Sequence, residues 1–379
     1  MRILFICNEY PPLIHGGIGS FTKLIAENLI LNNHEAIVAG YGTMDNDYTE
    51  EINGVPVLRI KKPRVFRGVF FNYVNMFVSR LSFYMKIRKY VLVYKPDLVE
   101  TYDWSAPLIF RPKGCRLVTR LHGSNTASNM SINIRKTPLL SCLERKAIRQ
   151  SDFIVSVSNY IADITQQSFK IKFSYKTIYN GVDTKKFFDQ HIERDYDEIL
   201  LVGRMHPYKG FDDLFKAMNY IFSHNHTVKL KIICTVIESY KNKLMNYVDP
   251  RFKYRIYFIG RVPNDELPYY YNKANLTVLP SRTEAFPIIP LESMACGTPV
   301  IMADRFSARE IINDGIDGFL TDTNDPEKFA ENICQILNEQ EAIENMRTKC
   351  REKVLEMFSI DKVIKNNIEF YQSIATHAI

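Results

Sequence analysis

Short apolar runs alternate with amphipathic stretches along almost the whole chain. The apolar runs of the first half predict β-strands at residues 2–7, 36–40, 55–60, 97–102, 116–121 and 153–158. Helical spacing appears at residues 18–31, and Thr137-Pro138 predicts another helix start, because proline is favoured in a first turn. Strands that alternate with helices form parallel sheets, so the pattern predicts an α/β fold.

A polar, turn-rich stretch at residues 180–197 interrupts this alternation and predicts a linker. After it, strands are predicted at residues 198–204, 228–234, 255–260, 275–280 and 298–302. Helices are predicted from Lys209, from about Pro287, from the cap at 325–327 and over residues 360–374. We therefore expect two Rossmann-like, doubly wound domains, residues 1–185 and 186–359, with a C-terminal helix of about 360–379 packed back on the first.

Length and charge agree with this division and narrow the class of partner. A chain of 379 residues is longer than one core usually covers. The net charge of +7 favours anionic partners such as phosphates or lipid head groups. The sequence has no zinc finger, aromatic RNA-binding motif or basic run, so no nucleic-acid partner is expected.

The cysteines and the N-terminal residues bear on the compartment. The seven cysteines include no C-x-x-C pair, and Cys7 and Cys296 lie in apolar surroundings. This predicts buried thiols in a reducing cytoplasm and no metal site. The apolar start at residues 3–7 is too short for a signal peptide. We expect a cytoplasmic protein, with peripheral contact to the inner face of the membrane as an alternative location.

The unusual polar and glycine residues follow predicted strands in both halves. They are Gly16, Gly17, His122, Arg204, Lys209 and Glu284. Open α/β sheets bind ligands beyond the carboxyl ends of their strands. Two such edges that face each other predict a cleft between the domains.

Each of these residues also has an ordinary structural explanation. Glycine pairs form tight turns, a lone histidine is usually satisfied in a core or turn, and single cationic side chains are usually solvated. The glycines do not complete a dinucleotide fingerprint, because Thr22 stands where the third glycine belongs. Neither a Walker A motif nor a G-x-S-x-G motif occurs. The shared position after strands is what favours a binding site.

The stretch "SRTEAFPIIPLESMACGTPVI" at residues 281–301 adds carboxylates to a predicted anion site. Arg204 and Lys209 suit phosphate oxygens, and a helix that begins near Pro287 would present free N–H groups to an anion. Glu284 and Glu292 make poor phosphate ligands but good acceptors for hydroxyl groups. A diphosphate with hydroxyl-bearing groups at both ends is a nucleotide sugar.

These segments resemble a known family over nearly the whole chain. The run "VGRMHPYKGFDDLFKAM" is similar to the Arg-x4-Lys-Gly segment of the retaining family 4 glycosyltransferases, and residues 284–292 are similar to their E-x7-E signature. Further similar segments are "GRVPNDELPYYYNKANLTVLPS", "YNGVDTKKF", "RLHGS", "ERKAIRQSDFIVSVSNY" and "EIINDGIDGFL". The resemblance implies the GT-B fold, in which two Rossmann-like domains face each other across a cleft.

The resemblance also implies roles for individual residues. Arg204 and Lys209 would hold the donor diphosphate, Glu292 the ribose and Glu284 a hydroxyl of the transferred sugar. Catalytic residues would be His122, Arg204, Lys209 and Glu284. Donor-binding residues would be Gly16, Gly17, Arg204, Lys209, Val262, Glu284, Phe286, Pro287, Ile288 and Glu292. The family often has E-G-F-G where this chain has residues 284–287, so Pro287 removes a backbone donor there.

The implied reaction moves a sugar from a nucleotide diphosphate sugar, a UDP- or GDP-sugar, to an acceptor hydroxyl with retention. Neither a metal nor another cofactor is expected, and the acceptor would be a sugar or lipid-linked molecule in polysaccharide or glycoconjugate assembly. Alternatives are a GT-B phosphorylase, a nucleotide-sugar epimerase, a dinucleotide-dependent enzyme and a non-catalytic nucleotide-sugar-binding protein.

Residues 61–95 mix basic and aromatic side chains. One apolar face at helical spacing is formed by Phe70, Val74, Phe77, Leu81 and Tyr84. Amphipathic helices of α/β domains usually pack on the sheet, so we expect this face to be buried there. The alternative is contact with an anionic membrane.

Overall fold

The computed structural model describes residues 1–13, 16–63, 72–131 and 137–375. Its contacts divide the chain into unit 1, Met1–Ile178 with Ile364–Ile379, and unit 2, Tyr179–Val363. The division falls earlier than the predicted boundary at residue 185. The reason is that Val182 bonds to the far end of unit 2, where its N–H donates to the Phe358 carbonyl and its carbonyl accepts from the Ile360 N–H, both at 2.9 Å.

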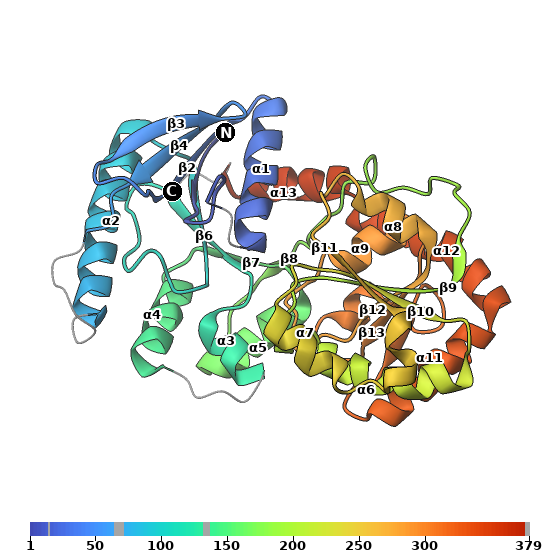
Figure 1. Cartoon of the computed structure of the whole chain (residues 1–379). Helices are drawn as coiled ribbons and strands as arrows, with labels where there is room; N and C mark the ends of the chain where they lie inside the picture. The colour runs from blue at the N-terminus through green and yellow to red at the C-terminus, as the bar shows by residue number, and fades with distance from the viewer. Residues whose placement is uncertain (14–15, 64–71, 132–136, 376–379) are drawn as a thin grey trace. The chain divides into compact units, whose positions relative to one another are not determined.

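Unit 1 contains a sheet with the strand order β3-β4-β2-β1-β5-β6-β7-β8 (Figure 1). The strands are β1 Arg2–Ile6, β2 Glu35–Tyr41, β3 Tyr48–Ile52, β4 Val55–Ile60, β5 Leu98–Tyr102, β6 Arg116–Leu121, β7 Phe153–Ser156 and β8 Lys176–Thr177. The ladders run parallel, and β3 pairs antiparallel to β4 at one edge. The sequence did not predict β3 or β8, which lie at the two edges of the sheet and carry few apolar residues.

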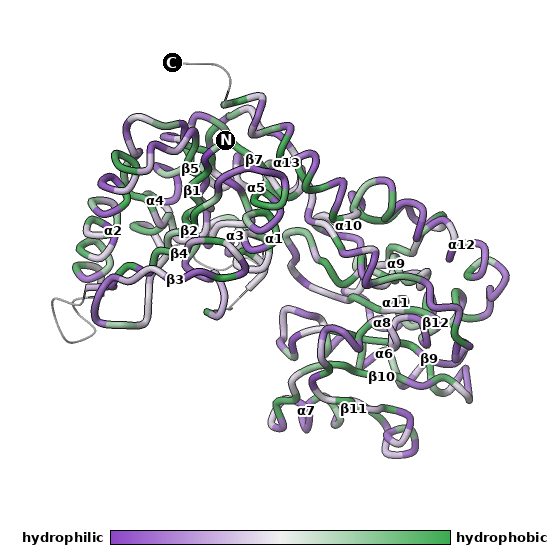
Figure 2. The backbone as a smooth tube through the Cα atoms, turned by 90° about the horizontal axis from the view of Figure 1, so that it is seen from above, coloured by the Kyte–Doolittle hydropathy of each residue, from purple (hydrophilic) through white to green (hydrophobic). Residues whose placement is uncertain are grey.

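The helices of unit 1 are α1 Gly17–Leu31, α2 Asn72–Tyr94, α3 Asn125–Ser131, α4 Pro138–Arg149, α5 Asn159–Phe169 and most of α13 Ile360–Ala375. Thr137 precedes Pro138 as predicted, but its side chain makes no cap bond, whereas the Ser158 hydroxyl accepts the Ile161 N–H and caps α5. Hydrophobic stretches of unit 1 lie along its central strands, whereas α2 alternates hydrophobic and hydrophilic residues (Figure 2).

A buried polar network holds α13 in unit 1. The Arg120 guanidinium on β6 is almost completely buried and pairs with Glu100 on β5 at 2.7 Å. It also donates to Asn367 at 2.6 Å and to the Tyr371 hydroxyl at 3.1 Å. Removing either α13 partner would leave a buried charge short of a hydrogen bond, which is strongly unfavourable. This network explains why the last helix belongs with the first sheet.

The predicted burial of the apolar face of α2 is wrong. Val74 is 44% exposed, Phe77 50% and Leu81 37%, while Tyr84 is only partly buried. Phe70 lies outside the described residues. The face predicted to contact the sheet therefore faces away from it.

The physical reason lies in what the helix covers. In its C-terminal half, Phe83, Ile87 and Val91 pack into the core of unit 1. In its N-terminal half, the buried positions are taken by Ser79 and Arg80, which line a polar cavity. A helix that borders a polar cavity places its polar residues inward, so the apolar residues of that half are left outside.

Unit 2 contains a parallel sheet with the order β11-β10-β9-β12-β13-β14. The strands are β9 Asp195–Val202, β10 Lys229–Ile233, β11 Ile256–Gly260, β12 Ala274–Leu279, β13 Val300–Ala303 and β14 Phe319–Thr321. The helices and turns are η2 Pro207–Lys209, α6 Phe211–His224, α7 Glu238–Met245, η3 Pro250–Arg255, α8 Leu267–Lys273, α9 Ile289–Ala295, α10 Ala308–Ile311, α11 Pro326–Asn338, α12 Gln340–Lys353 and η4 Val354–Phe358. The core lies between the sheet and helices such as α6 and α11. Asp325 caps α11 as predicted, because its carboxylate accepts the N–H groups of Glu327 and Lys328.

The two resulting sheets confirm the prediction of an α/β protein with two Rossmann-like domains. All seven cysteines are free, and Cys7 and Cys296 are buried, as expected. Within the described ranges, no helix has the length and apolar content needed to cross a bilayer.

Candidate donor site and the loops around it

The predicted residues of unit 2 converge where its sheet changes direction. From β9 the chain proceeds outward through β10 and β11, then returns to place β12 on the other side of β9. Ligands bind at such a switch point, beyond the carboxyl ends of the two strands. Lys209 follows β9 and Glu284 follows β12, and the Lys209 Nζ lies 2.5 Å from a Glu284 carboxylate oxygen. The structure thus brings together two residues that are 75 positions apart.

A glycine permits this approach. Gly210 has a φ of +70°, a left-handed conformation that side chains disfavour, and a Cβ there would lie 1.9 Å from the Pro280 carbonyl oxygen. The start of α6 therefore packs directly against the end of β12. Sequence reasoning noted the Lys-Gly pair only as part of the family resemblance, and the contact with Pro280 required the fold.

Arg282 fixes the loop that carries Lys209. Its backbone N–H donates to the Tyr208 carbonyl at 2.7 Å. Its guanidinium makes two bonds to Asp213 in the first turn of α6, at 2.9 and 2.6 Å. Sequence analysis missed this role, because an arginine in "SRTEAF" looks like one more surface charge. The bidentate pair places Lys209 relative to Glu284 without using either side chain.

Arg204 is positioned differently from Lys209. It follows β9 directly after Gly203 and its side chain is exposed. No acidic side chain of the described residues forms an ion pair with it. Arg204 therefore presents an exposed guanidinium to solvent at the same sheet edge, ready to bind an anion.

Glu292 lies in the first turn of α9, and its carboxylate accepts a bond from the buried Tyr271 hydroxyl at 2.8 Å. Burial raises the pKa of Glu292 to about 7, although Tyr271 and Lys186 oppose the shift. A carboxylate with this pKa changes its protonation near neutral pH. Sequence analysis missed Tyr271, because three consecutive tyrosines at 269–271 gave no sign of which one is buried.

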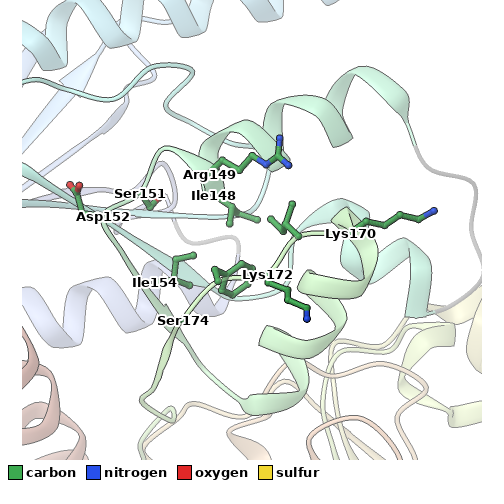
Figure 3. Close-up of a pocket in the computed structure, with 10 residues that line it drawn as sticks. Ile148, Arg149, Ser151, Asp152, Ile154, Lys170, Lys172 and Ser174 are labelled. Atoms are coloured by element: carbon green, nitrogen blue, oxygen red, sulfur yellow. The ribbon is translucent and has the colours of Figure 1, made fainter.

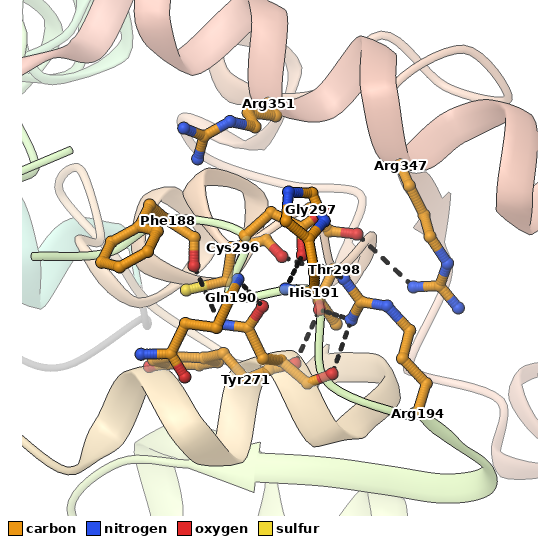
Figure 4. Close-up of polar contacts among 12 residues, drawn as sticks. Phe188, Gln190, His191, Arg194, Tyr271, Cys296, Gly297, Thr298, Arg347 and Arg351 are labelled. Atoms are coloured by element: carbon orange, nitrogen blue, oxygen red, sulfur yellow. Dashed lines mark hydrogen bonds and ion pairs between the residues drawn. The ribbon is translucent and has the colours of Figure 1, made fainter. Parts of the chain in front are cut away.

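The scaffold behind Glu292 is a network around the end of α9 (Figure 4). The Arg194 guanidinium donates to the Cys296 carbonyl at 3.0 Å and to the Thr298 hydroxyl at 2.6 Å. The Thr298 hydroxyl in turn donates to the Tyr271 carbonyl at 2.6 Å. One network thus joins the C-terminal end of α9 to the residue that bonds Glu292.

The stretch between the two glutamates differs from its prediction. The ring of Phe286 is buried and stacks on Tyr179 at 4.9 Å, and its carbonyl accepts from Asn180 at 3.0 Å. Its side chain is therefore part of the core and is not available to a ligand. Its backbone is the part that remains near the candidate donor site.

The helix after this stretch begins at Ile289, two residues after Pro287, close to the predicted start. Pro290 occupies its first turn, where no backbone N–H is needed, and Ile288 is the residue before the helix. Pro290 in this first turn and Pro287 before the helix both lack an N–H. The start of α9 therefore has fewer hydrogen-bond donors for an anion than a helix start without proline. Val262 follows β11, a strand separated from β9 by β10.

The remaining predicted residues lie in unit 1. Gly16 precedes α1 and Gly17 is its first residue. A Cβ at Gly16 would lie 3.0 Å from a Glu9 carboxylate oxygen, whereas a Cβ at Gly17 would meet open space. The more demanding position is Gly19, where a Cβ would lie 2.1 Å from the Glu9 carbonyl. Gly19 therefore allows α1 to pack against the loop after β1.

His122 follows β6, and its backbone N–H donates to buried Asp103 at 2.9 Å. The Gly123 N–H donates to the same carboxylate at 3.2 Å. Burial, followed by the charge of Arg120, lowers the pKa of His122 to about 3. Its imidazole is therefore neutral at physiological pH and can accept or donate one hydrogen bond. The residue fits binding of a hydroxyl better than transfer of a proton.

Across the described parts of the chain, no three His, Cys, Asp or Glu side chains are grouped as a metal site requires. This edge carries two cationic side chains, Arg204 and Lys209, beside two carboxylates. Its carboxylates, Glu284 and Glu292, have separate partners in Lys209 and Tyr271. Such a set can bind a diphosphate and the hydroxyl groups on either side of it.

Comparison with family models assigns both halves of the chain. Residues 15–186 match the model described as Glycosyltransferase Family 4. Residues 182–354 match the model described as Glycosyl transferases group 1. The second range contains each of the candidate donor residues from Arg204 to Glu292.

Individual relatives agree with these assignments. An uncharacterized glycosyltransferase of Methanocaldococcus jannaschii is 27% identical over 391 residues, which is 98% of each chain. The N-acetyl-alpha-D-glucosaminyl L-malate synthase of Bacillus anthracis is 26% identical over 273 residues, which is 68% of each chain. Among solved structures, the sucrose-phosphate synthase of Thermosynechococcus elongatus has a TM-score of 0.83 at 18% identity and full coverage of both chains. Anabaena HepE, in complex with UDP and glucose, has a TM-score of 0.75 at 17% identity, with 98% of this chain and 100% of HepE covered. These structures show that the fold is GT-B.

Proposed function

Because the chain belongs to the family 4 glycosyltransferases of group 1, we propose that it transfers a sugar from a nucleotide diphosphate sugar to an acceptor hydroxyl, with retention at the anomeric carbon. A UDP-sugar is the favoured donor, and the HepE complex with UDP and glucose supports that choice. Polysaccharide or glycoconjugate assembly in the cytoplasm is the proposed setting.

One observation carries the proposal: Lys209 meets Glu284 at the β9–β12 switch point, beside the exposed Arg204. In the donor complex, Lys209 and Arg204 bind the diphosphate, and Glu284 accepts a hydrogen bond from a hydroxyl of the sugar. Glu292 accepts hydrogen bonds from the ribose hydroxyls. The ion pair between Lys209 and Glu284 holds both side chains near the positions that these ligands need.

The proposed reaction takes place on one face of the sugar. The acceptor oxygen forms a bond to the anomeric carbon while the bond from that carbon to the diphosphate oxygen breaks. The acceptor's proton moves to an oxygen of the leaving diphosphate. Lys209 and Arg204 stabilise the charge that develops on this diphosphate. Since these cations supply the compensating charge, we expect full transfer activity in the presence of EDTA, measured on purified protein.

The decisive experiment begins with thermal shifts of the whole protein in UDP, GDP and their sugars. A matched ligand raises the melting temperature, because it binds the folded state. Product analysis then separates transfer from phosphorolysis and epimerisation, and a matched donor that gives no product would indicate a binding protein. Glu284→Gln should impair use of the sugar donor but leave free nucleotide binding nearly intact, whereas Glu292→Gln should weaken both. Identical behaviour of the two variants would contradict the assigned roles.

The location is the second part of the proposal. Between Glu51 and Asp97 the sequence contains no aspartate or glutamate, and α2 exposes Val74, Phe77 and Leu81 on one face. An exposed apolar face on a helix that itself carries no acidic residue matches an anionic bilayer. Lys86 of this helix is paired with Asp47 at 2.6 Å, so the remaining basic residues supply the attraction to the bilayer. We therefore assign α2 to peripheral contact with such a bilayer, where a lipid-linked acceptor is found. Residues 64–71 of the basic stretch lie outside the described residues.

A further inference from the structure

Unit 1 contains a cavity of about 670 Å³ at the carboxyl ends of β1, β2, β4 and β5. The sheet changes direction between β1 and β5, so this edge is the ligand-binding edge of unit 1. The N-terminal half of α2 closes one side. A volume of this size suits a small molecule such as a monosaccharide derivative.

A second cavity of about 480 Å³ lies at the opposite edge of the sheet, where Ser151 and Asp152 precede β7 (Figure 3). Its basic residues, Arg149, Lys170 and Lys172, are exposed, and its carboxylate pairs with an arginine outside the cavity. Amino-terminal strand ends are not where such sheets bind ligands. The cavity at the carboxyl ends is therefore the stronger candidate.

The floor of the carboxyl-end cavity is fixed by hydrogen bonds. The Asn8 amide donates to the Tyr102 hydroxyl at 2.9 Å and accepts the Tyr41 N–H at 3.0 Å. Glu9 lies beside it, and its Oε2 is buried without a hydrogen-bond partner in the described part of the chain. A buried carboxylate oxygen without a donor is unfavourable, and a ligand hydroxyl would supply the donor.

Arg80 is the most informative side chain of this cavity. It is only 8% exposed, and its Nη2 donates to the Ser105 carbonyl. Its Nη1 is buried with no hydrogen-bond partner among the described residues. No carboxylate of those residues lies within ion-pair distance of it. Burial lowers the pKa of Arg80, although Tyr41, Glu144 and Tyr102 oppose the shift.

The buried carboxylate of Glu144, whose charge acts on Arg80, is already engaged elsewhere. One carboxylate oxygen of Glu144 accepts hydrogen bonds from the backbone N–H groups of Ser105 and Asn125, both at 3.0 Å. The other accepts from the N–H and the hydroxyl of Thr126, at 3.1 and 2.6 Å. It therefore has no oxygen left to pair with Arg80. A buried guanidinium that forms no ion pair and leaves Nη1 without an acceptor is unfavourable, so an anionic group that reaches Nη1 would be favoured there.

Trp104 completes the cavity. It is the only tryptophan of the sequence and is 40% exposed in the loop after β5. The apolar faces of sugar rings pack against aromatic rings, and tryptophan offers the largest such face. Asp103, next to it, bonds the backbone of His122, so this loop is fixed against the loop after β6.

We propose that this cavity binds the acceptor, and that the acceptor is a saccharide with an anionic substituent, a phosphate or a carboxylate. The anionic group forms an ion pair with Arg80. Glu9 and Asn8 bind hydroxyl groups of the saccharide, and Trp104 packs on its ring. The proposal rests on the glycosyltransferase function, because it assigns the second substrate of that reaction. A neutral ligand would leave Arg80 uncompensated.

Tryptophan fluorescence of the whole protein tests the proposal, because all of its signal comes from Trp104. Glucose, glucose 6-phosphate and glucuronate are titrated in turn, and the two anionic sugars distinguish phosphate from carboxylate recognition. At least one anionic sugar should bind about tenfold or more tightly than glucose, as expected for a buried charged hydrogen bond. If neither anionic sugar binds better than glucose at millimolar concentrations, the proposal is wrong.

Variants of α2 identify the residue responsible. Arg80→Gln keeps a donor for the Ser105 carbonyl but removes the charge, so the preference for the anionic sugar should disappear. Arg88→Gln, on the exposed side of the same helix, is the matched control and should retain the preference. Equal loss in both variants, or equal retention, would overturn the assignment. Thermal shift by UDP is measured on each variant, so that failure of the donor proposal is seen separately from failure of this one.

Discussion

The ligand-binding edges of the two units differ in how their charged groups are satisfied. In unit 2, Lys209 is paired with Glu284, and Glu292 accepts from Tyr271. In unit 1, Arg80 Nη1 and a Glu9 oxygen are buried without partners in the described residues.

The two edges therefore differ in whether the polar groups of the site are already paired in the free protein. At the edge of unit 2, protein groups hold one another in position, and the donor must replace some of those contacts. At the edge of unit 1, the protein supplies charge and hydrogen-bonding capacity that only a ligand completes. The first arrangement favours precise geometry in the free protein, and the second favours selectivity, because a ligand without the matching groups leaves buried ones unsatisfied.

The strongest test of the comparison is Lys209→Ala. It removes a phosphate-binding cation and leaves Glu284 without its partner, so transfer should fall by about 100-fold or more. Steady-state kinetics and UDP binding measure the effect. Lys349→Ala, an exposed lysine on α12, is the control and should change neither quantity. Wild-type affinity for UDP in the Lys209 variant would remove the basis for a donor edge in unit 2.

Phe286→Ala tests whether the middle of the predicted motif contacts the donor or supports the site. Its ring is buried against Tyr179, so truncation should lower the free energy of unfolding by about 3 kcal/mol. Affinity of the folded protein for UDP should change little, because the side chain faces the core. Denaturant titration and calorimetric binding measure the two effects. A large loss of affinity with unchanged stability would instead make Phe286 a ligand contact.

The raised pKa of Glu292 predicts opposite effects of pH on stability and binding. In the folded protein the pKa of this carboxyl group is about 7, above the usual glutamate value of 4.5. The protonated group therefore stabilises the fold relative to the unfolded chain, and this stabilisation is lost as the pH rises from 4.5 through 7. Glu292→Gln should therefore be more stable than the wild type at pH 8, by about 3 kcal/mol, and the difference should vanish near pH 4.5. Donor affinity of the wild type should fall below pH 7, where the carboxylate is lost. A pH-independent stability difference would contradict the assignment.

The smallest effect is expected for the exposed face of α2. The wild type should sediment with vesicles that contain anionic lipid at low salt, and less with neutral vesicles or at high salt. The double variant Phe77→Ser/Leu81→Ser should bind about tenfold less, since it removes two exposed apolar side chains. Leu355→Ser, an exposed leucine of unit 2, is the control. Unchanged vesicle binding by the α2 variant would assign that face to another partner.

The sequence predicted most of the fold and part of the site. Strands such as β1 and β12 are continuous apolar runs, so periodicity identified them, and Arg204, Lys209 and Glu284 stand next to those runs. The sequence could not predict the Gly210–Pro280 contact or the Arg282–Asp213 pair, because both depend on how β9 and β12 pair. The cavity of unit 1 was missed for the same reason.

The misprediction of α2 has a related cause. Helical spacing shows that Val74, Phe77 and Leu81 share a face, but it does not show what that face contacts. The usual assumption that the apolar face covers the sheet fails where the helix borders a polar cavity. Arg80 was counted with the other basic residues of the stretch, although it alone of those on α2 is buried. Its burial depends on the Ser105 carbonyl from a loop 25 positions away.

The network that joins Arg120 to Asn367 and Tyr371 also sets an order of events during synthesis. Unit 2 is a continuous segment that ends at Val363, so all of it emerges from the ribosome before the part of α13 that belongs to unit 1. Unit 1 is begun first but lacks two of the partners of its buried arginine until α13 has been added. Domains generally fold as units, in the order in which they leave the ribosome. In this protein the N-terminal unit is consequently completed after the second unit, and a nascent chain that stops at Val363 contains all of unit 2 and an unfinished unit 1.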